Sequence, residues 1–276
     1  MLAGPTLLDA AMGTALQARG LPEEALPEEW ILTRPEDVAK VHASHAAAGA
    51  RVLLTCTFNC TEPRLATRGI EQKLDALCGW AERLARAASR GALVAGCVGP
   101  TGLSVPGRPW PSQAELRELF RRPFRALADA GVDLLWTETH YALAEARAAV
   151  AAARATGLAV AATMAFAERD GALAAPDGEA AVECLLALAR DGAAAVGANC
   201  LSPGPALAAL VARVAPALDV PLVAKPNAGP PGAALDPDAF AAAVGPAARA
   251  GARLLGGCCG TTGAHLAALS VLLRSL

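Results

Sequence analysis

Short apolar segments alternate with longer amphipathic segments along the whole chain. The short segments are rich in β-branched and aliphatic residues, which is typical of buried strands. They lie at residues 6–9, 52–58, 93–98, 134–139, 159–166, 194–200, 222–226 and 254–257. The longer segments place apolar residues three and four positions apart, which predicts amphipathic helices. Two such stripes are Ile70, Leu74, Leu77, Ala81, Leu84 and Ala88, and Leu207, Leu210, Val211 and Val214.

The alternation predicts repeated βαβ units, and therefore a parallel sheet of the α/β class. Eight such units without a long linker, in a chain of 276 residues, match a single (β/α)8 TIM barrel, with residues 1–276 as one domain. A doubly wound open sheet is the structural alternative, but it gives no reason for the strand count to stop at eight. In a barrel, we expect the active site at the C-terminal ends of the strands.

Several helix boundaries carry capping signals. A serine or threonine followed three residues later by glutamate predicts a capping box, and an aspartate before a proline predicts an N-cap. These signals are Ser112 with Glu115, Thr33 with Glu36, and Asp236 with Pro237. Within the helix predicted over residues 115–129, Pro123 should produce a kink or a break, because proline lacks the backbone N–H.

Composition excludes several classes of partner. The net charge is −2, the pI is about 6.1 and 4% of the residues are aromatic, so neither a basic stripe nor a stacking platform points to nucleic acid. The N-terminal segment lacks a positively charged start, and the longest uncharged run, 192–212, contains prolines and an asparagine. We therefore expect no signal peptide, no membrane span and a cytoplasmic location.

Eight cysteines are present, and three of them lie at or directly after the ends of predicted strands. In a chain of this size without a signal peptide, reduced thiols or a metal site are favoured over disulfides. Cys200 ends the sixth strand, and Cys258 and Cys259 follow the eighth, so all three can meet over the barrel mouth. Adjacent residues on a strand face opposite sides, so the backbone must leave strand geometry for both members of the pair to bind one ion. The glycines that permit such a turn are Gly256, Gly257 and Gly260.

Three thiolates with one exchangeable position define a catalytic zinc site. A free thiol has a pKa of roughly 8.5, and coordination to Zn²⁺ deprotonates it at neutral pH. Cys200, Cys258 and Cys259 are therefore predicted to activate a small thiol substrate as a nucleophile. The alternatives are a vicinal disulfide or inert buried thiols, and the inert interpretation is favoured for the other five cysteines. These are Cys56, Cys60, Cys78, Cys97 and Cys184.

Two acidic residues end apolar strands, where an unpaired carboxylate would be costly to bury. Glu138 either binds a substrate ammonium or pairs with an arginine, and Asp9 has the same two options or serves as a helix N-cap. His42 and His45 are interpreted as surface or packing residues. A further alternative uses the glycines at 256 and 257 to cradle a phosphate, which two adjacent cysteines fit poorly.

Seven motifs together resemble the homocysteine S-methyltransferase family, and they run nearly from end to end. They are LDAAMGTAL (8–16), TCTFN (55–59), GCVGPTG (96–102), ETHYALAEARAAV (138–150), GANC (197–200), KPNAG (225–229) and GGCCGTTGAHL (256–266). GANC together with GGCCGTT is highly specific. The family includes betaine–homocysteine methyltransferase, S-methylmethionine-dependent enzymes and the N-terminal module of cobalamin-dependent methionine synthase. The motifs of this chain resemble the sequence of the methionine synthase module most.

The resemblance implies a barrel that binds Zn²⁺ and forms methionine from homocysteine. It places the zinc on Cys200, Cys258 and Cys259. It places the amino group of homocysteine on Glu138 and Asp9, and the carboxylate on backbone N–H groups of the turn formed by Ala10, Ala11 and Met12. Three positions depart from the family pattern: Cys56 replaces a common asparagine, Ala10 a common glycine and Gly263 a frequent proline.

The resemblance leaves the methyl donor open. Eight βα units use up the chain, so we expect any cobalamin or methylfolate to be carried by a separate corrinoid or methylfolate-binding partner protein. The alternative is a small methylated donor such as S-methylmethionine or betaine. Two other hypotheses are a non-catalytic zinc- or thiol-binding subunit of a methyl-transfer assembly, and a phosphate-ligand barrel with incidental cysteines.

Overall fold

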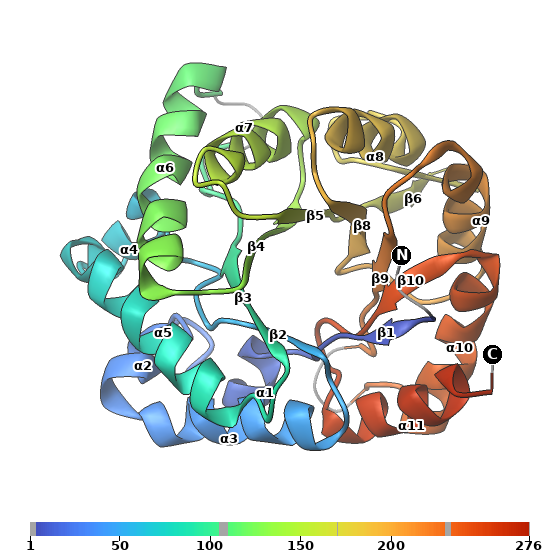
Figure 1. The fold of residues 1–276 in the computed structure, drawn as a ribbon, viewed down its shortest axis with the longest axis horizontal. Helices are drawn as coiled ribbons and strands as arrows, with labels where there is room; N and C mark the ends of the chain where they lie inside the picture. The colour runs from blue at the N-terminus through green and yellow to red at the C-terminus, as the bar shows by residue number, and fades with distance from the viewer. Residues whose placement is uncertain (1–3, 105–109, 170, 230–232, 276) are drawn as a thin grey trace.

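The parallel sheet closes into a barrel in the computed structural model, which describes residues 4–104, 110–169, 171–229 and 233–275. The strand order is β1-β10-β9-β8-β5-β4-β3-β2, and a bridge between Leu8 and Val52 joins the last strand of this order to the first (Figure 1). The strands are β1 (Thr6–Leu7), β2 (Val52–Leu54), β3 (Leu93–Val98), β4 (Leu134–His140), β5 (Val160–Met164), β8 (Ala195–Asn199), β9 (Leu222–Lys225) and β10 (Ala252–Leu255). The predicted (β/α)8 barrel is confirmed.

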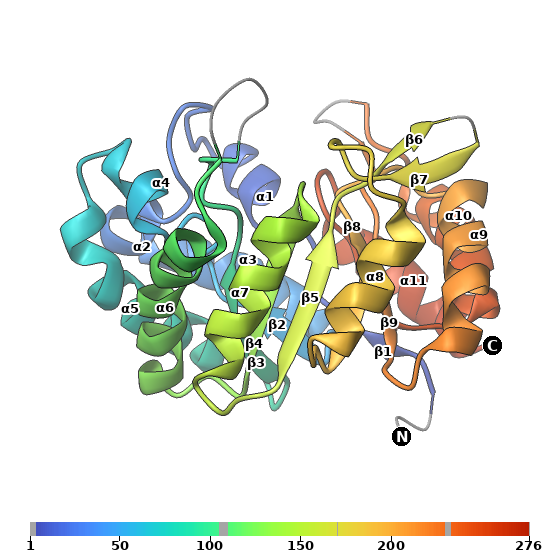
Figure 2. The same ribbon diagram turned by 90° about the horizontal axis from the view of Figure 1, so that it is seen from above.

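Helices form a ring around the strands (Figures 1 and 2). The ring consists of α3 (Pro35–Ala47), α5 (Leu74–Ala88), α6 (Gln113–Ala130), α7 (Leu143–Arg154), α8 (Ala181–Arg190), α9 (Pro205–Val214), α10 (Pro237–Ala250) and α11 (Gly263–Leu273). Shorter helices lie in the loops after β1 and β2, namely α1 (Gly13–Gln17), α2 (Glu29–Thr33) and α4 (Glu62–Ala66). Within the described residues, none of the helices combines the length and the apolar character needed to cross a membrane.

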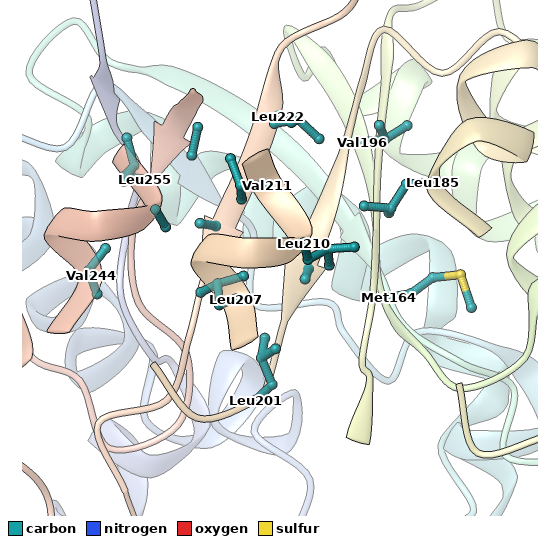
Figure 3. Packing of buried hydrophobic residues seen from close by; sticks show 14 of the residues in the cluster. Met164, Leu185, Val196, Leu201, Leu207, Leu210, Val211, Leu222, Val244 and Leu255 are labelled. Atoms are coloured by element: carbon teal, nitrogen blue, oxygen red, sulfur yellow. The ribbon is translucent and has the colours of Figure 1, made fainter. Parts of the chain in front are cut away.

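The apolar core has two shells. Inside the barrel, small and aliphatic side chains pack with Trp136, whose side chain is almost completely buried. Outside it, the predicted helix stripes pack against the sheet, and Figure 3 shows Val211 of α9 beside Leu222 of β9. Each buried leucine or valine contributes about 1.5–3 kcal/mol relative to an exposed one, so both shells hold the strand ends in fixed positions.

The ends of several strands differ from the prediction. The predicted strand 52–58 stops at Leu54, because the chain turns where the N–H of Thr57 donates to the carbonyl of Thr55 at 2.8 Å. The last strand covers Ala252–Leu255 instead of 254–257. A hairpin of β6 (Ala167–Arg169) and β7 (Ala172–Ala174) follows β5, on the side toward which β5 points (Figure 2), and the apolar pattern did not indicate it.

The helix-start predictions have mixed outcomes. The capping box at Ser112 and the N-cap at Asp236 are confirmed by side-chain hydrogen bonds to the first turn of each helix. The capping box at Thr33 is wrong, because Thr33 belongs to α2, where its hydroxyl donates to the carbonyl of Glu29 at 2.8 Å. Pro123 does not split its helix: α6 continues through it, and its ring is buried on the core side.

Candidate active site

Three cysteine side chains converge at the C-terminal ends of two strands. Cys200 follows β8, and Cys258 and Cys259 follow β10, so β9 lies between the two groups. Their sulfur atoms lie within 4.8 Å of one another, and the Cys200 and Cys259 sulfurs are 4.0 Å apart, although 59 residues separate them in the chain. All three side chains are partly exposed and carry free thiols. The predicted convergence is confirmed.

A spacer segment, residues 225–228 at the end of β9, lies between the loop that carries Cys200 and the loop that carries Cys258 and Cys259. On one side, the N–H of Cys200 donates to the carbonyl of Lys225 at 3.2 Å. On the other side, the N–H of Cys258 donates to the carbonyl of Pro226 at 2.8 Å, and the N–H of Ala228 donates to the carbonyl of Cys259 at 2.9 Å. These main-chain bonds fix the separation of the sulfurs without using any side chain of the spacer segment.

The backbone leaves strand geometry at the cysteines, as predicted. Cys200 has φ of 57° and Gly260 has φ of 79°, both in the left-handed region. A Cβ at Gly260 would collide with the carbonyl oxygen of Gly229, so only glycine fits there. The N–H groups of Gly256 and Gly257 donate to the carbonyls of Ala224 and Asp9, at 3.1 and 3.0 Å. They are therefore already engaged, which argues against a phosphate cradle.

Hydrogen bonds among the three thiols shift their pKa values in different directions. Hydrogen bonds from Cys200 and Cys258 lower the pKa of Cys259 to about 3, and donating to its two neighbours raises the pKa of Cys200. The side-chain amide of Asn199 also faces the Cys258 sulfur at 3.8 Å, and Asn199 is itself held by Thr139 at 2.6 Å. The trio is thus arranged to hold negative charge on sulfur.

The donor set fits a small thiophilic cation. With Zn–S bonds of about 2.3 Å and tetrahedral angles, bound sulfurs lie about 3.8 Å apart. The measured 4.0 Å between the Cys200 and Cys259 sulfurs is close to that separation. Among the residues that the structure describes, these three cysteines form the one cluster of His, Cys, Asp or Glu side chains with metal-binding geometry. Cys200, Cys258 and Cys259 could therefore hold a metal ion.

Asp9 and Glu138 share a buried lysine that the sequence analysis did not single out. The ammonium of Lys225 lies 2.9 Å from Oδ1 of Asp9 and 3.1 Å from Oε1 of Glu138. The partner is therefore a lysine, where an arginine or a helix N-cap had been considered. Burial alone would lower the pKa of Lys225, but attraction to the two carboxylates raises it. Burial raises the pKa of Glu138, and the lysine opposes that effect. The signal available in the sequence was a lysine within the otherwise apolar predicted strand 222–226.

A pocket of about 340 Å³ joins the cysteines to these charges. Its lining includes Ala10, Ala11 and Met12, the turn expected to bind a carboxylate. The N–H of Ala11 is already bonded to the hydroxyl of Thr261 at 3.1 Å. The full lining is Asp9, Ala10, Ala11, Met12, Gly13, Thr14, Gln17, Pro27, Glu28, Leu54, Thr55, Cys56, Phe58, Asn59, Cys97, Glu138, Thr139, Tyr141, Cys200, Lys225, Gly257, Cys258 and Cys259.

A larger hollow of about 710 Å³ lies outside the barrel, between α5 and α6. Its charged groups are paired with one another: Arg122 with Glu62 and Asp75, and Arg125 with Asp129. It contains no cysteine, and we assign the chemistry to the smaller pocket.

The histidines serve packing and capping. His42 and His45 are buried, so of the two options considered for them packing is the one observed. His140 contacts the hydroxyl of Thr137. His265 accepts from the start of α11 and faces the carbonyl of Leu235 at 2.8 Å.

Comparisons with known proteins agree with this geometry. The profile of the family described as homocysteine S-methyltransferase matches residues 6–273. The homocysteine S-methyltransferase of Escherichia coli K12 is 32% identical, with 95% of this chain and 93% of that protein covered. The homocysteine S-methyltransferase YbgG of Bacillus subtilis is 29% identical, with 98% and 95% covered. The metallated form of the Escherichia coli homocysteine methyltransferase MmuM superposes with a TM-score of 0.83 at 31% identity, covering 98% of this chain and 96% of that one.

Barrel, thiol cluster and pocket together define the class: a barrel methyltransferase whose site lies at the C-terminal ends of the strands. The chain belongs to the homocysteine S-methyltransferase family, because the family profile covers nearly its whole length. The resemblance drawn from the seven motifs is thereby confirmed.

Proposed function

We propose that the chain is a zinc-dependent homocysteine S-methyltransferase that forms methionine. The observation that carries the proposal is the meeting of three sulfurs, from two loops far apart in sequence, beside a pocket with a buried acidic pair. Family membership supports the reaction, and the existence of a metallated form of the Escherichia coli homocysteine methyltransferase MmuM supports a bound metal.

Cys200, Cys258 and Cys259 would hold the zinc, which when bound supplies Lewis-acid activation of the acceptor thiol at neutral pH. Cys259 already favours the thiolate form, whereas the pKa values of Cys200 and Cys258 are raised, so loading the site would release the protons of these two thiols. The acidic pair Asp9 and Glu138 provides the negative charge that an amino-acid ammonium needs.

The turn at Ala10, Ala11 and Met12 is proposed to receive the carboxylate through backbone N–H groups. Because Thr261 already engages the Ala11 N–H, Ala10 and Met12 are the better candidates. Orientation of the acceptor by its two charged ends would hold its sulfur beside the cysteines, where positioning can contribute a large part of the rate enhancement.

The three sulfurs are partly exposed, which would leave them accessible to a methyl donor. We propose either a separate corrinoid or methylfolate-binding protein or a small donor such as S-methylmethionine or betaine. We further propose that residues 1–276 act as one domain. We also propose that the protein works in a reducing compartment such as the cytoplasm, since its cysteine ligands must remain reduced.

The deciding experiment measures methionine formation from homocysteine with methylcobalamin, S-methylmethionine, betaine and methylfolate in parallel. Turnover with at least one donor, lost in zinc-free protein and restored by zinc, is the expected result. A zinc-replete protein that turns over none of these donors would instead support the non-catalytic subunit. Protein without stoichiometric zinc after loading would remove the metal hypothesis.

A further inference from the structure

The loop that carries the adjacent cysteines is joined by two threonine hydroxyls to the segment that follows β1. The hydroxyl of Thr261, in the cysteine loop, accepts from the N–H of Ala11 at 3.1 Å, although 250 residues separate the two. The hydroxyl of Thr14, at the start of α1, accepts from the N–H of Gly260 at 3.1 Å. Each segment therefore holds a backbone N–H group of the other.

Thr261 also fixes the backbone of a proposed metal ligand. Its hydroxyl donates to the carbonyl of Cys258 at 2.6 Å, and its own N–H donates to the same carbonyl at 3.0 Å. Because a hydroxyl has one proton and two lone pairs, this one side chain can donate to Cys258 while it accepts from Ala11. Thr261 is 1% exposed, so water does not compete for either bond. The two bonds share an oxygen and therefore strengthen each other.

Gly257 leaves the space that the Thr261 side chain needs. A Cβ at Gly257 would lie 2.4 Å from the hydroxyl oxygen of Thr261, 2.5 Å from its Cγ2 and 2.6 Å from its Cβ. Gly257 does not have a positive φ angle, so freedom of the backbone is not the reason for a glycine at this position. The glycine that the sequence analysis assigned to the turn instead permits close packing of Thr261.

The residue at the other end of this link belongs to the pocket. Ala11 is the middle residue of the turn after β1, and the turn and the cysteine pair line the same pocket. A bond at the N–H of Ala11 restricts the orientation of the peptide groups on either side of it. These are the groups proposed to receive the carboxylate of the acceptor. A cation held by the cysteine pair would immobilise the loop and, through Thr261, the turn.

We propose that Thr261 is a positioning residue that transmits occupancy of the metal site to the turn after β1. The turn is then fully ordered only in metal-loaded protein, so the metal and the amino-acid end of the acceptor bind with positive cooperativity. The inference rests on the proposed function and adds to it the route by which the two ligands affect each other.

The first test measures amide exchange at residues 10–14 by mass spectrometry, with and without zinc. In the original protein, zinc should slow exchange there about tenfold. Thr261→Val keeps the charge and nearly the shape of the side chain but removes the hydroxyl, so zinc should have little effect on exchange in this variant. Thr261→Ser keeps the hydroxyl and should restore the effect of zinc.

The second test measures binding of 2-aminobutanoate by calorimetry. This ligand has the ammonium and the carboxylate of homocysteine but no thiol, so the ratio of its affinities with and without zinc measures cooperativity in the absence of a metal–sulfur bond. Thr261→Val should lower this ratio about fivefold, the effect of one hydrogen bond. The substitution changes no charge, so direct electrostatic interaction between the cation and the ligand cannot produce the difference.

The matched control is Thr61→Val. Thr61 is also buried, and its hydroxyl has no hydrogen-bond partner among the residues that the structure describes, so both measurements should match those of the original protein. If Thr261→Val does not fold, Thr14→Val takes its place. It removes the acceptor of the Gly260 N–H from a half-buried position and should lower both quantities in the same direction.

Zinc content and thermal unfolding are recorded for every variant. Zinc-loaded Thr261→Val with the exchange and the affinity ratio of the original protein would overturn the inference, as would an original protein whose exchange at 10–14 does not respond to bound zinc. A higher ratio in Thr261→Val would also overturn it, because Thr261 would then only occupy an N–H that the ligand prefers. Absence of zinc binding or of turnover contradicts the proposed function instead, and neither measurement requires a methyl donor.

Discussion

Single side chains in the pocket owe their protonation to the groups around them. Cys259 ionises readily because two neighbouring thiols donate to it, which brings its pKa to about 3. A divalent cation bound as proposed would replace the protons of the three sulfurs, so we expect metal binding to be coupled to proton release.

Replacing Cys258 by serine should release the metal. A serine hydroxyl stays protonated at neutral pH, so zinc affinity should fall by more than the roughly 10–100-fold typical of changes around a metal site. The measurement is zinc content after dialysis against a weak chelator. Cys56→Ser is the matched control, because Cys56 lines the same pocket and is outside the thiol cluster. A zinc-replete Cys258→Ser protein would contradict the ligand assignment.

His42 should make the fold sensitive to acid. Burial, with a smaller contribution from His45, lowers its pKa from 6.5 to about 4. The unfolded chain therefore binds this proton below pH 6.5, and the folded protein binds it only near pH 4. The contribution of neutral, buried His42 to the free energy of unfolding is complete above pH 6.5. It is lost as the pH falls to about 4, a change on the order of 3 kcal/mol.

The measurement for His42 is the urea midpoint of metal-free protein between pH 7 and pH 4. Since other groups titrate in this range, the quantity of interest is the difference between the original protein and His42→Phe, whose ring cannot take a proton. As the pH falls, the original protein should lose stability relative to His42→Phe. Parallel curves for the two proteins would show that His42 does not contribute.

Residue types and placement were enough to find the thiol cluster but not the buried ion pairs. Cys200 and the pair at 258–259 can be recognised in the sequence by their position at strand ends and by the glycines beside them. Lys225 lies 216 residues from Asp9 and 87 from Glu138, so its role exists only after the barrel brings three strands together. A lysine in an apolar strand end carries no local signal that names its partners.

Individual elements depend on a few backbone positions that tolerate no side chain. Gly260 lies in the loop that carries Cys258 and Cys259, and its missing Cβ makes room for the carbonyl of Gly229. Gly69 has a similar left-handed φ of 65° but nothing within 4 Å of the Cβ position. Comparing substitutions at the two glycines therefore distinguishes the free-energy cost of backbone strain from that of a steric collision.

Gly69→Ala should therefore destabilise the protein by about 1–2 kcal/mol, the cost of placing a Cβ in the left-handed region. Gly260→Ala should cost more, because the added atom also displaces the loop, and it should lower zinc affinity as well. Denaturant unfolding and zinc titration of both variants provide the measurement. Equal costs and equal zinc affinities would show that the contact with Gly229 does not constrain the loop.

Elements were predicted well where a long periodic pattern existed and poorly where geometry was set by contacts. The stripe of α9 and the cap at Ser112 follow from local sequence. The hairpin of β6 and β7 has no buried face of its own, so alternation did not mark it. At Thr33 the local signal was real, but the hydroxyl bonds within the preceding helix because Pro35 begins the next one.

At the scale of the whole molecule, the bonds that close the barrel lie apart from the thiol cluster. The closure between β1 and β2 uses the Leu8–Val52 bridge and the bond from the N–H of Leu54 to the side chain of Asp9, and none of these residues belongs to the loops that carry the cysteines. The eight-strand count was visible in the sequence because each strand is an apolar run. The closing contact between β1 and β2 could not be predicted, because neither segment has a sequence feature that indicates its pairing with the other.

Removal of the metal should therefore lower the melting temperature without unfolding the protein at 25 °C. Bound ligand stabilises by mass action, about 4 kcal/mol at a thousandfold excess over Kd, and that contribution disappears with the ion. Circular dichroism should keep its helical signal, and amide exchange should accelerate at residues 199–201 and 257–261 while the central strands stay protected. Global unfolding on chelation would contradict this separation of fold and site.

The spacer segment after β9 has a consequence for anyone who wishes to move this centre into another scaffold. Copying the two loops that bear the sulfurs would omit the peptide groups at 225–228 that hold them at a fixed distance. A transplant would have to carry three neighbouring strand ends, including one that contributes no ligand, and a mutational scan of side chains would never reveal why.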